Sequence, residues 1–243
     1  MSRFIEFNNP PVQYLTIEDH VNAYVVGDLH GCYEELMKEL DRINFDKSRD
    51  ILICVGDLID RGKSSEKIIA LLDEPWFVSV LGNHEQLCMQ GNVSYSYEQA
   101  HKEERSGGTW FYNLPKDVRD RYVEKFLKLP IILEIKYKNK KYGIVHAEVP
   151  TSNWNRLKRQ VINNSKHKDG RTIKNHCLWA RNLVHHKSAN IRNIDRVYLG
   201  HSVVPHACNI NDIKNVGNCT FIDTGCVYGL WLSIVKLGDK KVC

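Results

Sequence analysis

The fold is decided by one stretch of the chain, ILICVGDLIDRG at residues 51–62. Its first five residues are apolar, a pattern that predicts a short buried strand. A glycine and a polar loop follow, and residues 64–72 then carry apolar side chains at helical spacing. Ser64 or Ser65 is suited to be the N-cap of that helix. We therefore interpret the stretch as a strand, a loop and a helix in succession.

The same order of elements occurs on both sides of this stretch. Upstream, the apolar pattern predicts a strand at residues 21–26 and a helix at residues 33–43. Downstream, it predicts a strand at residues 77–81 and a helix from about His84. Consecutive units of this kind indicate parallel strands joined by helical crossovers.

The second half of the chain has a different pattern. A helix is predicted at residues 117–129, where Pro130 ends it. Further strands are predicted at residues 131–137, 142–147, 197–200, 219–223 and 230–235. Residues 84–113 and 151–196 are polar, and we expect them to be excursions from the core. The length of 243 residues suits one α/β domain, residues 1–243, with a β-rich second half.

Composition limits the classes of protein that the chain can belong to. Hydrophobic residues make up 42% and charged residues 26%, values typical of a soluble globular protein. Residues 1–20 lack the pattern of a secretory signal, and no apolar run reaches the roughly 18 residues that a membrane span needs. The eight cysteines are scattered without close pairs. We expect a cytoplasmic protein with reduced cysteines and no membrane partner.

Positive charge is concentrated in one segment. Residues 151–196 contain 11 Lys and Arg against 2 Asp, a balance of 11 − 2 = +9 in a chain whose formal charge is +5. Such a segment favours an anionic partner, and a solvated loop without a partner is the alternative.

Polar clusters follow each of the first three predicted strands directly. They read Gly27-Asp28-Leu29-His30-Gly31, Gly56-Asp57-Leu58-Ile59-Asp60-Arg61-Gly62 and Gly82-Asn83-His84-Glu85. Because the carboxyl ends of parallel strands share one edge of a sheet, we expect the clusters to converge. His146 and His201 end later strands in the same manner. Aspartate, asparagine and histidine are ligands for divalent first-row metals, so the sequence predicts a metal site at this edge.

These residues suit phosphate ester hydrolysis by two metal ions. A carboxylate such as Asp57 can bridge two ions about 3.5–4 Å apart, and a water held between them ionises near neutral pH and can attack phosphorus. The guanidinium of Arg61 could stabilise charge on the phosphoryl oxygens, and His84 is the candidate proton donor to the leaving alkoxide. Taken singly, each cluster has a simpler interpretation as a turn, a local salt bridge or a helix N-cap. Their joint occurrence favours the metal site.

The three clusters, in this order and spacing, resemble the signature of the phosphoprotein phosphatase family of metallophosphoesterases. The resemblance is closest to the lambda-phage-like serine/threonine phosphatases of bacteriophages and bacteria. It is strongest over residues 25–87, with shorter matches around His146, Arg181, His201 and residues 223–229. It implies a four-layer calcineurin-like α/β fold, with a central β-sandwich flanked by helices. It also implies two divalent ions, with manganese expected and iron, zinc or nickel as alternatives.

The resemblance also implies a role for each site residue. One metal would be held by Asp28 and His30, with Asp57 bridging to a second metal. The second metal would be completed by Asn83, His146 and His201. His84 would be the general acid, oriented by Asp60. Phosphate would be bound by Arg61 and Arg181, with Arg156, Arg159 and Arg171 as alternatives to Arg181. Ser106-Gly107-Gly108-Thr109-Trp110 resembles a Gly-Gly-x-Trp segment of the phage-like branch, which we interpret as a loop anchored by a core tryptophan.

The resemblance leaves several functions open. The first is dephosphorylation of phosphoserine and phosphothreonine in proteins, with phosphotyrosine as a further substrate. A symmetrical dinucleoside tetraphosphate hydrolase shares the metal signature, but such enzymes often carry proline where this chain has Lys63. An inactive phosphate-binding module would lack ligands, and none of the expected ligands is missing. Nucleic acid is not an expected partner, because the basic segment lacks interleaved aromatic residues and no nucleic-acid module is recognised.

Overall fold

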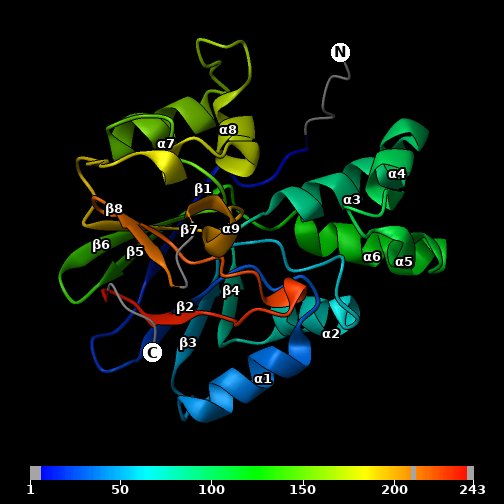
Figure 1. Cartoon of the computed structure of the whole chain (residues 1–243), viewed down its shortest axis with the longest axis horizontal. Helices are drawn as coiled ribbons and strands as arrows, with labels where there is room; N and C mark the ends of the chain where they lie inside the picture. Colours follow the sequence, from blue (N-terminus) through cyan, green and yellow to red (C-terminus); the bar gives the residue numbers. More distant parts are fainter. Residues whose placement is uncertain (1–6, 209–211, 240–243) are drawn as a thin grey trace.

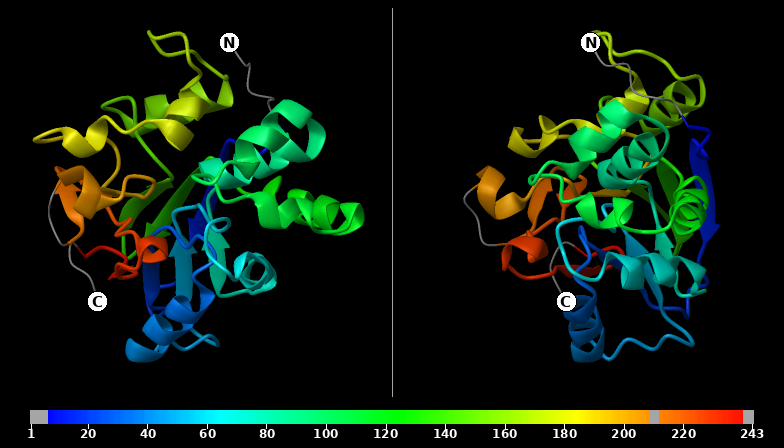
Figure 2. Two further views of the ribbon diagram at one scale, coloured as in Figure 1. Left: turned by 45° about the vertical axis from the view of Figure 1, so that its right-hand side comes forward. Right: turned by 90° about the vertical axis from the view of Figure 1, so that its right-hand side faces the viewer.

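The structure is a computed structural model that describes residues 7–208 and 212–239. Two β-sheets face each other at its centre, and helices cover both outer sides (Figure 1). The rotated views place helices α1 (Tyr33–Arg42) and α2 (Ser65–Ala70) on one side of the two sheets (Figure 2). Helices α7 (Trp154–Ile162) and α8 (Ile173–Trp179) lie on the opposite side. This arrangement confirms the expected α/β fold with a central β-sandwich flanked by helices.

The four-stranded sheet has the order β10-β2-β3-β4. Its strands are β2 (Ala23–Val26), β3 (Ile51–Cys54), β4 (Phe77–Ser79) and β10 (Ile234–Lys236). Strands β2, β3 and β4 are parallel, while β10 pairs antiparallel to β2. They are followed by helices α1 (Tyr33–Arg42), α2 (Ser65–Ala70) and α3 (Asn83–Val93). The three predicted strand–loop–helix units are therefore present, and their loops leave one edge of the sheet.

The six-stranded sheet has the order β1-β5-β6-β7-β9-β8. Its strands are β1 (Val12–Thr16), β5 (Ile132–Tyr137), β6 (Lys140–Val145), β7 (Arg196–Leu199), β8 (Lys214–Val216) and β9 (Cys219–Phe221). Strands β5 and β6 form a hairpin whose turn residues Lys138 and Asn139 have φ of 49° and 57°, as tight hairpin turns require. Strands β6, β7 and β9 are parallel, so the ends of β6 and β7 also face one edge.

A continuous apolar layer joins the two sheets. Val25, Ile53 and Val55 of the four-stranded side pack with Ile135, Ile144 and Tyr198 of the six-stranded side. All six are fully buried. Side chains of a strand alternate between its faces, so the neighbouring residues of β2 and β3 point outward and pack under helices in a second core.

The polar excursions contain more structure than the sequence predicted. The excursion at residues 84–113 contains helices α4 (Tyr95–Lys102) and α5 (Thr109–Tyr112), and the one at residues 151–196 contains α7 (Trp154–Ile162) and α8 (Ile173–Trp179). Outside the excursions lie the predicted helix, α6 (Lys116–Phe126), and the short helix α9 (Val204–Cys208). Helix α7 buries Trp154, Leu157 and Val161, which recur at helical spacing along an otherwise basic sequence. Within the described residues, no helix combines the length and apolar character needed to cross a membrane.

One local prediction is wrong, and another is confirmed in position but not in its hydrogen bond. The last predicted strand, residues 230–235, begins only at Ile234, because Trp231 and Ser233 bond to the loop that follows β9 instead of pairing in a strand. Ser64 is the N-cap residue of α2, as predicted, but its side chain accepts no capping bond and donates to Glu34. The hydroxyl of Ser65 instead accepts a bond from the Asp60 amide at 3.0 Å, so it supports the loop after β3.

Candidate active site

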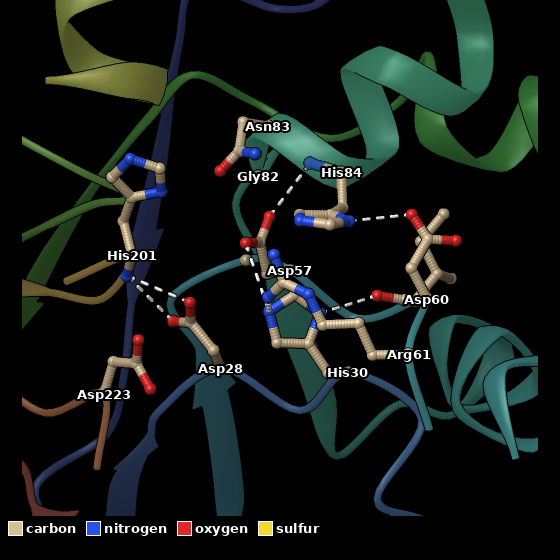
Figure 3. Close-up of polar contacts among 12 residues, drawn as sticks. Asp28, His30, Asp57, Asp60, Arg61, Gly82, Asn83, His84, His201 and Asp223 are labelled. Carbon is tan, nitrogen blue, oxygen red and sulfur yellow. Dashed lines mark hydrogen bonds and ion pairs between the residues drawn. The ribbon is translucent and has the colours of Figure 1, made fainter. Parts of the chain in front are cut away.

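The loops after β2, β3, β4, β6 and β7 bring the six candidate metal ligands together. Figure 3 labels all of them except His146. All are buried, with at most 5% of each residue exposed; they are Asp28, His30, Asp57, Asn83, His146 and His201. Hydrogen bonds lock the loops to one another. The His201 amide donates to Asp28 Oδ2 at 3.0 Å, and the His84 amide donates to Asp57 Oδ1 at 3.0 Å.

Asp57 lies between two groups of potential metal ligands. One group contains His30 and His84 and the other His146 and His201, and in each group one ligand atom per residue lies within 4.8 Å of the others. Asp57 Oδ2 is 3.5 Å from His30 Nε2, while Asp57 Oδ1 is 3.3 Å from His146 Nε2. Each carboxylate oxygen thus faces a different group, an arrangement suited to a carboxylate shared by two ions.

Two of the histidines also contact a backbone carbonyl through Nδ1, so their Nε2 is the nitrogen that faces the site. His30 Nδ1 is 2.8 Å from the Ile59 carbonyl, and His146 Nδ1 is 2.9 Å from the Val55 carbonyl. On His30, a proton on Nδ1 donates to the carbonyl and leaves Nε2 with its lone pair toward the site. His146 Nε2 instead lies 2.8 Å from Asn83 Oδ1, which is an acceptor, and Asp57 outweighs burial and raises the pKa of His146, so this nitrogen binds a cation only on losing its proton. Burial, followed by the nearby His84, lowers the pKa of His30 to about 3, so its imidazole is neutral. Neutral, oriented imidazoles are what metal binding requires.

Three buried carboxylates lie close together beside these histidines. Burial, together with neighbouring Asp223 and Asp57, raises the pKa of Asp28 well above its usual range. Burial and, to a smaller extent, Asp57 raise the pKa of Asp223 to about 6. Burial alone would also raise the pKa of Asp57, but the adjacent histidines hold it well below its usual range. Concentrated negative charge with imidazole donors is compensated by divalent cations, so these residues fit the two ions that the resemblance implies.

Glycines at the strand ends let the backbone approach these carboxylates. A Cβ at Gly200 would lie 2.0 Å from Asp28 Oδ1, and one at Gly82 would lie 2.3 Å from Asp57 Oδ1. Either side chain would displace a carboxylate. Glycine is therefore required next to His201 and Asn83, and its recurrence beside the polar residues is the sequence signal for the site.

The loops turn through left-handed backbone conformations at non-glycine residues. Five site residues have positive φ, namely His30 (40°), Asp57 (51°), Asp60 (75°), Arg61 (66°) and His201 (64°). This conformation is costly for L-residues and persists only where surrounding contacts impose it.

His84 and Asp60 form a buried pair. His84 Nδ1 is 2.8 Å from Asp60 Oδ2, and Asp60 is fully buried. Burial opposes ionisation of Asp60, but the neighbouring His101 and His84 outweigh it and lower its pKa. An ionised Asp60 accepts the Nδ1 proton and fixes the orientation of the His84 ring. His84 also lines the pocket of the site.

Three residues around Asp60 were not predicted as site residues. His101 Nε2 is 2.7 Å from Asp60 Oδ2, and Trp110 Nε1 donates to Asp60 Oδ1 at 2.8 Å. His101 Nδ1 is in turn 2.9 Å from the Tyr112 hydroxyl. A Cβ at Gly108 would lie 2.3 Å from the His101 ring. The interpretation of residues 106–110 as a loop anchored by a core tryptophan is therefore wrong, because Trp110 is partly exposed, lies in α5 and holds Asp60.

Glu85 is a further residue without a predicted role. Its buried carboxylate accepts bonds from the amides of Leu58 at 2.8 Å, Asp57 at 3.1 Å and Gly82 at 2.9 Å. It thereby ties the loop after β3 to the loop after β4. Its place directly after Asn83 and His84 was the signal that could have identified it.

The two predicted phosphate-binding arginines border one pocket. The pocket has a volume of about 370 Å³ and is lined by Arg61, Arg181, Asp57, His84, His201 and Asp223 among others. Arg61 Nη1 lies 2.6 Å from His30 Nε2, and Arg181 Nη1 donates to the His201 carbonyl. The alternatives to Arg181 do not line this pocket, and one of them, Arg171, pairs with Asp169.

Comparison with known proteins agrees with this geometry. The family model for calcineurin-like phosphoesterases matches residues 21–205. The chain is a calcineurin-like metallophosphoesterase. Members of this family use a dinuclear metal site, and the two ligand groups that share Asp57 are its candidates in this metallophosphoesterase.

Curated relatives of the metallophosphoesterase divide between two activities. This chain is 32% identical over 219 residues to serine/threonine-protein phosphatase 1 of Salmonella typhimurium, and the alignment covers 89% of the chain and 92% of the relative. It is 33% identical over 238 residues to serine/threonine-protein phosphatase 2 of Escherichia coli, covering 94% and 99%. It is also 32% identical over 188 residues to the symmetrical bis(5'-nucleosyl)-tetraphosphatase of Wigglesworthia glossinidia brevipalpis, covering 67% and 62%.

Solved structures share the fold of the metallophosphoesterase. A crystal structure described as that of a proposed diadenosine tetraphosphatase superposes with a TM-score of 0.61 at 22% identity, covering 95% of this chain and 96% of the other. A protein serine/threonine phosphatase from Saccharomyces cerevisiae superposes with a TM-score of 0.60 at 16% identity, covering 88% and 71%. At these identities, the likeness extends to the fold alone.

Proposed function

We propose that this metallophosphoesterase is a protein phosphatase that hydrolyses phosphoserine and phosphothreonine in phosphorylated proteins or peptides, with phosphotyrosine as a further substrate. The alignment covers nearly the whole length of the relatives from Salmonella typhimurium and Escherichia coli, and both relatives are named serine/threonine-protein phosphatases. We further propose that residues 1–243 form a single metallophosphoesterase domain and that it works in the cytoplasm.

Four of the proposed metal ligands belong to the two groups around Asp57, and the family resemblance adds Asp28 and Asn83. Asp28 and His30 would hold one ion, Asp57 would be shared, and Asn83, His146 and His201 would hold the other, with manganese as the first metal to test. Bound there, the ions would supply an activated water and withdraw charge from the phosphoryl group. Arg61 would leave His30 Nε2, which it contacts at 2.6 Å, when that nitrogen binds a metal. The freed guanidinium, together with Arg181, could then bind phosphate oxygens.

The observation that carries the proposal is the buried pair of His84 and Asp60, 2.8 Å apart. The serine or threonine oxygen leaves as an alkoxide, which is a poor leaving group unless it receives a proton. His84, oriented through Nδ1 by Asp60, can donate from Nε2. A dinucleotide tetraphosphate releases a nucleoside diphosphate, which is a better leaving group and depends less on such an acid.

The symmetrical dinucleoside tetraphosphate hydrolase is the second candidate. The Wigglesworthia glossinidia brevipalpis relative supports it over a smaller share of both chains. Lys63 departs from the proline frequent in such enzymes and is exposed beside the site loop. A phosphate-binding module without activity is the candidate of another class.

One experiment separates these candidates. Metal-stripped protein is assayed with and without Mn²⁺ on a phosphoserine peptide, a phosphotyrosine peptide and diadenosine tetraphosphate. Mn²⁺-dependent phosphate release from the peptides with little dinucleotide cleavage supports the protein phosphatase. Preferred conversion of the dinucleotide into two nucleoside diphosphates reassigns the substrate, and inactivity on all three substrates favours the binding module.

A further inference from the structure

A second cluster of metal-ligating side chains lies in the basic segment, outside the active site. It consists of His167, Asp169 and His176, one ligand atom of each lying within 4.8 Å of the others. His176 belongs to α8 and is 2% exposed, while the other two lie on the turn that precedes this helix. None of the three lines the active-site pocket.

The turn and the helix form one hydrogen-bonded unit. Lys166 and Thr172 pair as an antiparallel bridge, and the His167 amide donates to the Arg171 carbonyl at 2.7 Å. Gly170 closes the turn with φ of +83°. The Thr172 hydroxyl then accepts from the Asn175 amide at 3.2 Å and caps α8. The backbone therefore presents the three side chains to one point.

The distances within the cluster match those of a metal site. Asp169 Oδ1 lies 3.1 Å from His176 Nε2 and 3.4 Å from His167 Nδ1. An ion with tetrahedral bonds of about 2.0–2.1 Å separates its ligand atoms by about 3.3 Å. His167 Nδ1 is buried and makes no hydrogen bond, although it faces the carboxylate. His167 Nδ1 therefore has no hydrogen bond to lose and lies at the distance from Asp169 Oδ1 that two ligands of one ion would have.

We propose that His167, Asp169 and His176 form a structural site for a divalent ion of the zinc type, with a water molecule as the fourth ligand. Two imidazoles and one carboxylate suit zinc, nickel or copper better than manganese, magnesium or calcium. The site therefore takes a different class of metal from the manganese expected in the active site.

Neighbouring charge decides how the ion is recognised. Arg171 bonds to Asp169 Oδ2 at 2.7 Å from Nη2 and 2.9 Å from Nε. These bonds orient the carboxylate. Its Oδ1 accepts from the Arg171 amide at 3.1 Å and faces both histidines, and its Oδ2 also lies 3.1 Å from His176 Nε2. The same guanidinium, like nearby Lys166 and Lys168, repels a cation. Binding at this site therefore rests on coordination by imidazole and not on attraction by surface charge.

The position of the cluster indicates what the ion would stabilise. Helix α8 ends at Trp179, whose carbonyl lies 3.2 Å from His201 Nε2 and whose indole donates to Gln86 at 2.6 Å. Arg181, which lines the pocket, follows two residues later. An ion at the start of α8 would fix the turn to the helix and steady the segment that carries Arg181.

The test compares zinc bound per chain in full-length variants. Metal-stripped protein is dialysed against Zn²⁺ and its zinc content is measured, so no activity enters the result. His167→Gln and Asp169→Asn are each expected to bind one zinc ion fewer per chain than the parent. The matched control His186→Gln changes an exposed histidine of the same basic segment and is expected to bind as much as the parent.

A second variant tests the site without removing a ligand. Arg171→Ala is expected to tighten Zn²⁺ binding by about twofold to fivefold at low salt, because it removes a repelling charge. Equal zinc content in parent, His167→Gln and His186→Gln would overturn the proposal and leave the cluster as a hydrogen-bonded His–Asp–His group. Because only the difference between variants is read, this outcome is independent of the number of ions in the active site.

Discussion

Trp110→Phe tests whether the network around Asp60 supports proton donation by His84. Asp60 accepts contacts from His84 Nδ1 at 2.8 Å, His101 Nε2 at 2.7 Å and Trp110 Nε1 at 2.8 Å. Phenylalanine keeps an aromatic six-membered ring and removes the pyrrole part of the indole with its N–H. The buried carboxylate would then keep only its two histidine contacts at Oδ2, so the His84 ring would be oriented less firmly.

The size of the effect follows from one lost bond to a buried charge. A hydrogen bond to an ionised group contributes about 1.5–3 kcal/mol. If the loss of this hydrogen bond raises the free energy of the transition state by its full amount, turnover falls by about tenfold to 150-fold, since each 1.4 kcal/mol is a factor of ten. The full loss applies only where the leaving group needs a proton.

The assay measures kcat/KM with Mn²⁺ on a series of phosphate monoesters of rising leaving-group pKa. The loss in Trp110→Phe is expected to be small for p-nitrophenyl phosphate and largest for alkyl phosphates. Trp154→Phe is the matched control, because its indole also donates to a carboxylate, Glu134, at 2.7 Å but far from the site. Equal losses on good and poor leaving groups, or a loss of bound metal, would refute the reasoning.

Other predictions concern the acid, the metal site and the buried thiols. His84→Asn should slow hydrolysis of alkyl phosphates by ~10² to 10⁴ while metal content measured in the same sample stays unchanged. Gly200→Ala should lower metal content and activity together, because its Cβ would lie 2.0 Å from Asp28 Oδ1; retained metal would contradict the packing argument. Burial raises the pKa of Cys219 to about 12 and that of three other thiols, Cys54, Cys88 and Cys177. These thiols stay protonated when folded, so their contribution to stability is complete below about pH 8.5 and declines above it, by about 1.4 kcal/mol per pH unit for each thiol. Urea unfolding between pH 8 and 9.5 should show this decline, and Cys219→Ala should reduce its slope by one thiol's share; an unchanged slope would count against it.

Much of the fold could be predicted from the spacing of apolar residues and glycines within short stretches of sequence. The three strand–loop–helix units were predictable because each couples an apolar run to a glycine and then to helical periodicity. Strands β1 (Val12–Thr16) and β8 (Lys214–Val216) were not predicted, since both lie at sheet edges and bury few side chains. Helix α7 was hidden by the lysine and arginines between its buried residues, and α8 by its short length of 7 residues.

The candidate site was predictable where a residue and its chemistry lie within one loop. The strand-end position of His146 and His201 was sufficient to place them, because parallel strands share an edge. His101 and Trp110 were not predictable from spacing. They reach Asp60 across 41 and 50 residues of sequence through α4 and α5, and nothing local to them indicates a buried carboxylate.

The five left-handed residues of the site bear on attempts to make the protein more heat-resistant. Each non-glycine residue in this conformation costs about 1 kcal/mol or more relative to glycine, so together they cost about 5 kcal/mol. That sum is comparable to the whole net stability of an ordinary domain. A selection for thermal resistance alone would therefore favour glycine at Asp60 or Arg61, and its most stable products would be the least able to bind and cleave phosphate. Thermostable variants of this chain need to be selected for turnover and melting temperature at once.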